Sequence, residues 1–230
     1  HLLRYRKRYV LPRSQNNSHR VKRIASVLNL KEAVAPKLWT SEYCDNLAEG
    51  LLPQGKKILA VGPTANWQAK TWRPEYFSEL VNKLIGPGSI LSGGCILLLG
   101  RDDERPMVQM LINSIPDKNL IDLIGRIDLL TAYACLKRSS FYIGNDSGLM
   151  HLAAASGVPT LGLFGPTQKE LYAPWGKNTD TVSTTIPYLK IFPENFDHRT
   201  SESLMDSLSV DMVYDAAQAL WARTRGEIDD

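Results

Sequence analysis

The sequence predicts an α/β fold, a parallel β-sheet with helices on both faces, and two observations support this prediction. From residue 57 onward, short apolar runs typical of buried strands alternate with longer runs of helical pattern. Most of the apolar runs end at or beside a glycine, which marks a turn before the next helix. Regular alternation of this kind produces parallel strands, because each helix carries the chain back to the edge where the previous strand began.

The individual elements follow in chain order. A linker containing proline and glycine is expected at 51–55, and the first strand, at 57–62, is expected to open a domain. Residues 1–50 look like the end of another structural unit, and they contain weak helical patterns at 18–28 and 41–49. Further strands are expected at 95–100, 120–122, 141–144 and 160–164. Helices are expected at 75–85, 104–114, 129–137, 148–156 and 210–221, and the stretch 179–199 is expected to be irregular.

Composition narrows the class of protein. The chain has 230 residues, of which 43% are hydrophobic and 22% charged, so it can bury a sizeable core. No apolar run of about 18 residues or signal-peptide pattern occurs, and a soluble, cytoplasmic protein is expected. Three widely spaced cysteines argue against a disulfide framework and a four-ligand zinc site, so we expect them to be reduced and mostly buried.

The net charge is only +3, but residues 1–23 carry eight lysines and arginines and no acid. Such a stretch could meet nucleic acid, an anionic membrane surface or a phosphorylated substrate, although a solvated basic surface is more frequent. Nucleic acid is the least favoured of these partners, because no nucleic-acid-binding module accompanies the basic stretch.

Ligands of parallel sheets bind at the carboxyl ends of the strands, which directs attention to four loops, at 62–72, 100–104, 144–148 and 165–167. The third loop begins a helix of small residues. Asp146 or Ser147 is a good N-cap there, Gly148 leaves the first turn without a side chain, and the free N–H groups favour an anion. A diphosphate is therefore expected at this turn.

Ser147 and His151 are four residues apart, so both are expected to face the crevice and contact a phosphate or a sugar hydroxyl. Alternatively, Ser147 only caps the helix and His151 packs against a carbonyl. Asp146 would repel a diphosphate, so it is expected to face something neutral, either backbone N–H groups or sugar hydroxyls.

The remaining loops supply further candidates. Lys70 offers a compact positive charge to a diphosphate leaving group, with Thr64 and Asn66 as polar contacts, unless it is an ordinary surface lysine. Glu104, or else Asp103, could hold a ribose diol, but both acids could equally cap the following helix. Gly165 and Thr167 could line the phosphate or sugar, or form only a turn. No ligand cluster points to a metal.

Three segments, Lys70-Thr-Trp-Arg-Pro-Glu-Tyr-Phe, Asn145-Asp-Ser-Gly-Leu-Met-His-Leu-Ala-Ala-Ala and Leu163-Phe-Gly-Pro-Thr, together resemble glycosyltransferase family 9, the lipopolysaccharide heptosyltransferases. The resemblance covers roughly residues 57–225. It implies a GT-B-type architecture with a Rossmann-like donor domain, and inverting, metal-independent transfer of heptose from ADP-heptose to the lipopolysaccharide inner core without a cofactor. Lys70 matches the family's phosphate-binding lysine, and Glu104 falls approximately where the ribose is held. The donor-binding turn corresponds to Asp146, Ser147, Gly148, Leu149 and His151.

Family members also carry an amino-terminal acceptor domain with an aspartate as general base. Residues 1–50 resemble at best the end of that domain and its linker, while 51–230 match the donor domain and its carboxyl-terminal helix. The acceptor domain is thus largely missing, no general base can be assigned, and the chain is either a fragment of a longer enzyme or a truncated product.

The resemblance also implies partners: a nucleotide-sugar donor, a lipid-linked saccharide acceptor and peripheral contact with the inner membrane. An apolar patch left exposed near the crevice would favour a homodimer. The alternatives are a non-catalytic nucleotide-sugar-binding protein and, less favoured, a nicotinamide-dependent dehydrogenase, because no Gly-x-Gly-x-x-Gly follows the first strand.

Overall fold

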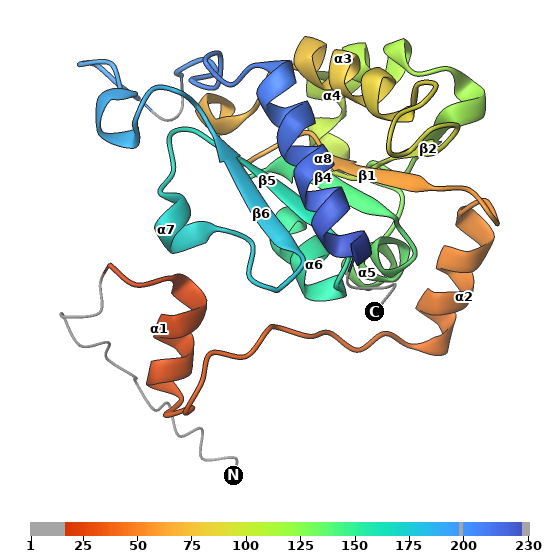
Figure 1. The fold of residues 1–230 in the computed structure, drawn as a ribbon, viewed down its shortest axis with the longest axis horizontal. Helices are drawn as coiled ribbons and strands as arrows, with labels where there is room; N and C mark the ends of the chain where they lie inside the picture. Colours follow the sequence, from red (N-terminus) through yellow and green to blue (C-terminus); the bar gives the residue numbers. More distant parts are fainter. Residues whose placement is uncertain (1–16, 198–199, 227–230) are drawn as a thin grey trace.

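The computed structural model describes residues 17–197 and 200–226, and its centre is a six-stranded parallel sheet (Figure 1). The strand order is β3-β2-β1-β4-β5-β6. The strands are β1 (Ile58–Gly62), β2 (Cys95–Leu98), β3 (Leu120–Asp122), β4 (Phe141–Asn145), β5 (Thr160–Phe164) and β6 (Thr179–Ser183). The order reverses between β1 and β4, and a crevice opens at such a switch point, beyond the carboxyl ends of the strands.

Helices cover both faces of the sheet, as the sequence predicts. The helices are α1 (Arg20–Val27), α2 (Glu42–Leu51), α3 (Pro74–Ile85), α4 (Arg105–Ser114), α5 (Leu129–Lys137), α6 (Gly148–Ser156), α7 (Lys169–Tyr172) and α8 (Val210–Gly226). One core cluster joins α3, α4 and α8 to the sheet, and the other joins α2, α5 and α6. Strand β1 contributes side chains to both clusters, because successive residues of a strand point to opposite faces of the sheet. Leu59 and Val61 belong to the first cluster, and Ile58 and Ala60 belong to the second.

The structure confirms the expected strands and helices from residue 57 to residue 164, with ends shifted by a few residues. The expectation of an irregular stretch at 179–199 is wrong at its start, where β6 pairs with β5 in register from Thr160↔Thr179 to Phe164↔Ser183. The reason is that β6 lies at the sheet edge and is only half-buried, so its Thr-Asp-Thr-Val-Ser sequence lacks the apolar run of a central strand.

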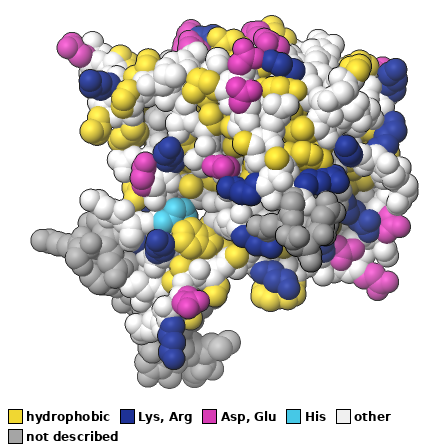
Figure 2. All heavy atoms as spheres, viewed as in Figure 1, with side chains coloured by type: hydrophobic (Ala, Val, Ile, Leu, Met, Phe, Trp, Pro, Cys, Tyr) yellow, Lys and Arg dark blue, Asp and Glu magenta, His cyan; other side chains and the backbone are white. Residues whose placement is uncertain are grey.

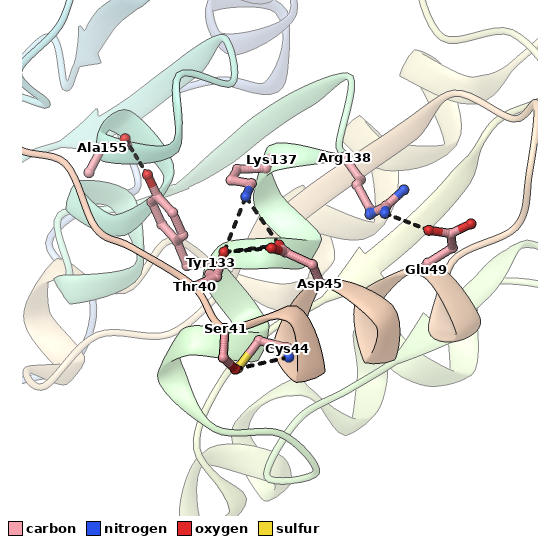
Figure 3. A network of polar contacts seen from close by, with 9 residues as sticks. All are labelled: Thr40, Ser41, Cys44, Asp45, Glu49, Tyr133, Lys137, Arg138 and Ala155. Carbon is pink, nitrogen blue, oxygen red and sulfur yellow. Dashed lines mark hydrogen bonds and ion pairs between the residues drawn. The ribbon is translucent and has the colours of Figure 1, made fainter.

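The segment before β1 packs on the sheet domain. Helix α2 lies on α5, where the Lys137 ammonium is 3.1 Å from the Asp45 carboxylate and the Arg138 guanidinium 2.8 Å from the Glu49 carboxylate (Figure 3). The Lys137 ammonium, with help from Thr40, holds the pKa of Asp45 below its usual value. Helix α2 therefore belongs to the same packed body as the sheet.

Helix α1 lies at the other end of this segment, against α7. The His19 ring nitrogen Nε2 is 2.9 Å from the Ala173 carbonyl oxygen, and the Arg20 guanidinium donates to the Tyr172 hydroxyl at 2.7 Å. Of the basic stretch at 1–23, the part before residue 17 lies outside the described residues. The described part brings Arg20, Lys22 and Arg23 to this edge of the molecule.

Other properties of the surface and core follow from the composition. The face drawn in Figure 2 carries both acidic and basic side chains, as the small net charge implies. The three cysteines are free and buried, as expected. In the described ranges, no helix is long and apolar enough to cross a membrane.

Candidate functional site

A cleft of about 930 Å³ opens at the carboxyl edge of the sheet, where the loops after β1, β2, β4 and β5 meet. Ten of the eleven residues that the sequence nominates for donor binding line this cleft. They are Thr64, Asn66, Lys70, Glu104, Asp146, Ser147, Gly148, Leu149, His151 and Thr167. The structure thus brings together residues that are up to 103 positions apart in the chain, from Thr64 to Thr167.

The exception is Gly165, which does not line the cleft. A β-carbon at this position would collide with the Met205 side chain and lie 3.1 Å from the methyl group of Thr184. The glycine is therefore required by packing behind the cleft wall. Two other glycines have a similar role, because β-carbons at Gly62 and Gly144 would collide with the buried hydroxyl of Tyr142.

Lys70 and Asp146 form an ion pair at the floor of the cleft. The Lys70 ammonium donates to a carboxylate oxygen of Asp146 at 3.2 Å, and only 12% and 8% of the two side chains are exposed. Lys70 is thus no ordinary surface lysine. The expectation that Asp146 faces a neutral group is wrong, because Asp146 directly follows β4 and its carboxylate pairs with Lys70 of the β1–α3 loop.

Helix α6 points its amino-terminal end into the cleft. Ser147 occupies the N-cap position with extended backbone, but its hydroxyl makes no capping bond. In the described part of the chain, the buried hydroxyls of Ser147 and Thr167 make no hydrogen bond of good geometry. The first N–H groups of α6 are consequently available to a ligand with several acceptor oxygens.

His151 and Gly148 extend this wall of the cleft. Desolvation by the surrounding protein lowers the pKa of His151, while the Asp146 carboxylate partly opposes this shift. A neutral imidazole ring can donate one hydrogen bond to a ligand. A β-carbon at Gly148 would meet no atom within 4 Å, so protein packing does not require the glycine, which instead leaves room for a ligand to approach the backbone.

Glu104 lines the cleft, but its carboxylate already has two partners. The same oxygen accepts a hydrogen bond from the Thr64 hydroxyl at 2.7 Å and one from the Arg101 backbone N–H at 2.9 Å. The second oxygen lies 3.8 Å from the Arg101 guanidinium, so the capping alternative describes the contacts of Glu104 in this structure. Asp103, the second choice for a ribose contact, pairs with the Arg101 side chain at the surface and does not line the cleft.

Asn145 is a structural determinant of the site that sequence reasoning did not single out. Its fully buried side chain accepts from the Trp72 backbone N–H at 3.0 Å and donates to the Pro63 carbonyl at 2.9 Å. These bonds tie both ends of the β1–α3 loop, with Lys70 between them, to β4. Trp72 anchors the same end of the loop by packing, since it is fully buried and its indole N–H donates to the Leu208 carbonyl at 2.8 Å. The sequence did contain a signal for Asn145, because it is a polar residue at the end of an otherwise apolar strand.

An apolar wall completes the cleft and was also missed. Its side chains come from the ends of β2 and β3 and from α5, and they are Leu99, Leu123, Ile127, Leu129 and Ala132. Trp67 and Tyr188 line the cleft as well. No local pattern reveals such a wall, because its members come from separate elements. A cleft lined both by apolar side chains and by an uncapped helix end suits a ligand with an aromatic ring and phosphates.

Among the described residues, no group of three or more His, Cys, Asp or Glu side chains could hold a metal ion. Positive charge in the cleft is supplied by Lys70, by Arg101 and by the amino-terminal end of α6.

The parallel sheet with its switch point and the cleft at the strand ends together define a Rossmann-like ligand-binding domain. The sequence profile of glycosyltransferase family 9 (heptosyltransferase) matches residues 2–195, and the chain belongs to this family. Its architecture matches the GT-B-type structures of the family.

Three relatives illustrate the match. Lipooligosaccharide heptosyltransferase 2 of Campylobacter jejuni is 30% identical over 128 residues, which are 54% of this chain and 39% of that protein. The glycosyltransferase family 9 structure from Veillonella parvula has a TM-score of 0.74 and 21% identity, covering 93% of this chain and 62% of that one. The structure of E. coli ADP-heptose lipopolysaccharide heptosyltransferase II has a TM-score of 0.69 and 20% identity, covering 86% of this chain and 57% of that one. The chain therefore spans only part of the length of these relatives.

Proposed function

We propose that this chain supplies the donor site of a heptosyltransferase, holding ADP-heptose in the cleft while heptose is transferred to the lipopolysaccharide inner core. The observation that carries the proposal is the convergence of Lys70 and the uncapped amino-terminal end of α6 on a single 930 Å³ cleft. The family membership and the names of the relatives support the choice of sugar and acceptor.

In this proposal each wall of the cleft has a separate task. The adenine ring would lie against the apolar wall, and the diphosphate would bind at the α6 terminus and Lys70. When the glycosidic bond breaks, negative charge develops on the diphosphate, and the Lys70 ammonium stabilises that charge without a metal ion. His151 would donate a hydrogen bond to a phosphate oxygen or to a sugar hydroxyl.

Deprotonation of the acceptor hydroxyl is a different task, and the proposal assigns it to no residue of this chain. The acceptor would be a lipid-linked saccharide. The basic residues of α1 support contact with an anionic inner-membrane surface, and the exposed apolar side chains of the α1–α2 segment support a homodimer.

Calorimetric titration of the chain with ADP, UDP and NAD tests the donor site. We expect selective ADP binding that persists in the presence of a chelator, because no metal takes part. Lys70→Ala and His151→Ala should each weaken it, Lys70→Ala by about tenfold or more, since a charge-assisted contact contributes roughly 1.5–3 kcal/mol. Lys118→Ala is the matched control, because Lys118 is exposed and lies outside the cleft.

The alternative of a non-catalytic nucleotide-sugar-binding protein predicts the same binding but no transfer. Incubation of the chain with ADP-heptose and an inner-core acceptor therefore separates the two functions. If ADP, UDP and NAD all fail to bind, the donor-site proposal is wrong for this chain.

A further inference from the structure

The cleft contains an acidic side chain in the place where an anion is expected to bind. Three carboxylates lie among its described lining residues, those of Glu104, Asp128 and Asp146. Glu104 accepts from Thr64 and from a backbone N–H, and Asp128 caps α5 by accepting from the Thr131 N–H at 2.8 Å. Asp146 differs from both, because its carboxylate pairs with the cleft lysine, Lys70.

The position of Asp146 makes it a competitor of a diphosphate. It is the residue immediately before Ser147, the N-cap of α6, so its carboxylate stands at the positively polarised end of that helix. Its oxygen lies 3.2 Å from the Lys70 ammonium, and both side chains are about nine-tenths buried. A diphosphate bound to Lys70 and to the α6 terminus would therefore meet a charge of its own sign that already occupies the lysine.

We propose that Asp146 is an internal competitor for Lys70 that weakens the binding of a free nucleoside diphosphate and so promotes release of the product. This inference rests on the proposed donor site. In the empty cleft Asp146 neutralises Lys70, and a diphosphate must displace the carboxylate to reach the ammonium. When the diphosphate leaves, the ion pair forms again and offsets part of the lost interaction.

The burial of the pair explains why the competition is effective. A buried lysine without a partner is strongly unfavourable, so the empty cleft needs a counter-charge near Lys70. Asp146 supplies that charge, and it also keeps the ammonium in a fixed position within the cleft. The residue is thus a positioning residue, acting on the ligand through Lys70.

The test compares the wild-type chain with Asp146→Asn by calorimetry and stopped-flow dissociation. Asparagine retains an oxygen that can accept from Lys70 but removes the charge. We expect ADP to bind about tenfold more tightly to the variant, a change of about 1.4 kcal/mol, mainly through slower dissociation. Adenosine, which lacks phosphates, should bind both proteins within twofold, whereas a general change of cleft structure would alter both ligands.

Glu170→Gln is the matched control, since it removes one negative charge from an exposed position of α7 that does not line the cleft. Its ADP affinity should equal that of the wild type. A second neutral variant, Asp146→Ser, should tighten ADP binding in the same direction and covers the case in which the asparagine variant fails to fold.

Unchanged or weaker ADP binding by folded Asp146→Asn, with the wild type binding ADP, would overturn the inference and leave the donor site intact. Failure of the wild-type chain to bind ADP at all would instead overturn the proposed function. The two failures are therefore distinguishable in a single set of titrations.

Discussion

The side chain of Asn145 offers the most direct test of how the fold positions the site. Asn145→Ala removes two hydrogen bonds, from the Trp72 N–H at 3.0 Å and to the Pro63 carbonyl at 2.9 Å. Both backbone groups belong to buried residues, so they are left without partners in the core. An unsatisfied buried group costs about 1–3 kcal/mol, which gives roughly 2–6 kcal/mol of lost stability for the pair.

For a chain of this size, 1 kcal/mol lowers Tm by about 2–4 °C, so we expect a decrease of roughly 4–24 °C in differential scanning calorimetry. The β1–α3 loop also loses its attachment to β4, and ADP affinity should fall by about tenfold, because Lys70 lies in that loop.

Asn178→Ala is the matched control. Its amide donates to the Gly157 carbonyl at 3.2 Å in a solvent-exposed hydrogen bond, so its loss should change stability by less than about 0.5 kcal/mol. A Tm of Asn145→Ala within 2 °C of the wild type would refute the reasoning, since it would mean that water satisfies both groups at no cost.

The remaining predictions concern the cleft backbone and the surface. Gly148→Ala should leave Tm unchanged or slightly raised, because its β-carbon meets no atom within 4 Å, yet it should reduce ADP affinity by about tenfold in calorimetry. Gly50→Ala in α2, also with open space at the β-carbon, is its control; equal ADP affinity for both variants would contradict close approach of a diphosphate to Gly148. For the surface, sedimentation velocity should show concentration-dependent dimers that Trp39→Gln and Tyr43→Gln weaken, because these side chains are 78% and 70% exposed. A strictly monomeric wild type at high concentration would count against the dimer, and binding to anionic vesicles that is insensitive to salt would count against electrostatic membrane contact.

The sequence by itself determined the central sheet, the helices around it and the location of the crevice. Buried parallel strands carry continuous apolar runs, and turns carry glycine and polar residues, so each element of 57–164 is encoded locally. The loop residues nominated for binding follow from the rule that the carboxyl ends of parallel strands share one edge. Ten of the residues nominated from the sequence alone therefore line one cleft in the structure.

Only the tertiary structure decided which of these residues contact one another. Strand β6 forms because β5 offers it a partner, and the apolar wall gathers side chains from three separate elements. The Asn145 bonds and the Lys70–Asp146 ion pair join residues that are 73 to 82 positions apart. Contacts between such distant residues depend on the packing of the whole sheet, and no local periodicity encodes them. The sequence could therefore place Asp146 beside a diphosphate, while its pairing with Lys70 emerged only from the folded chain.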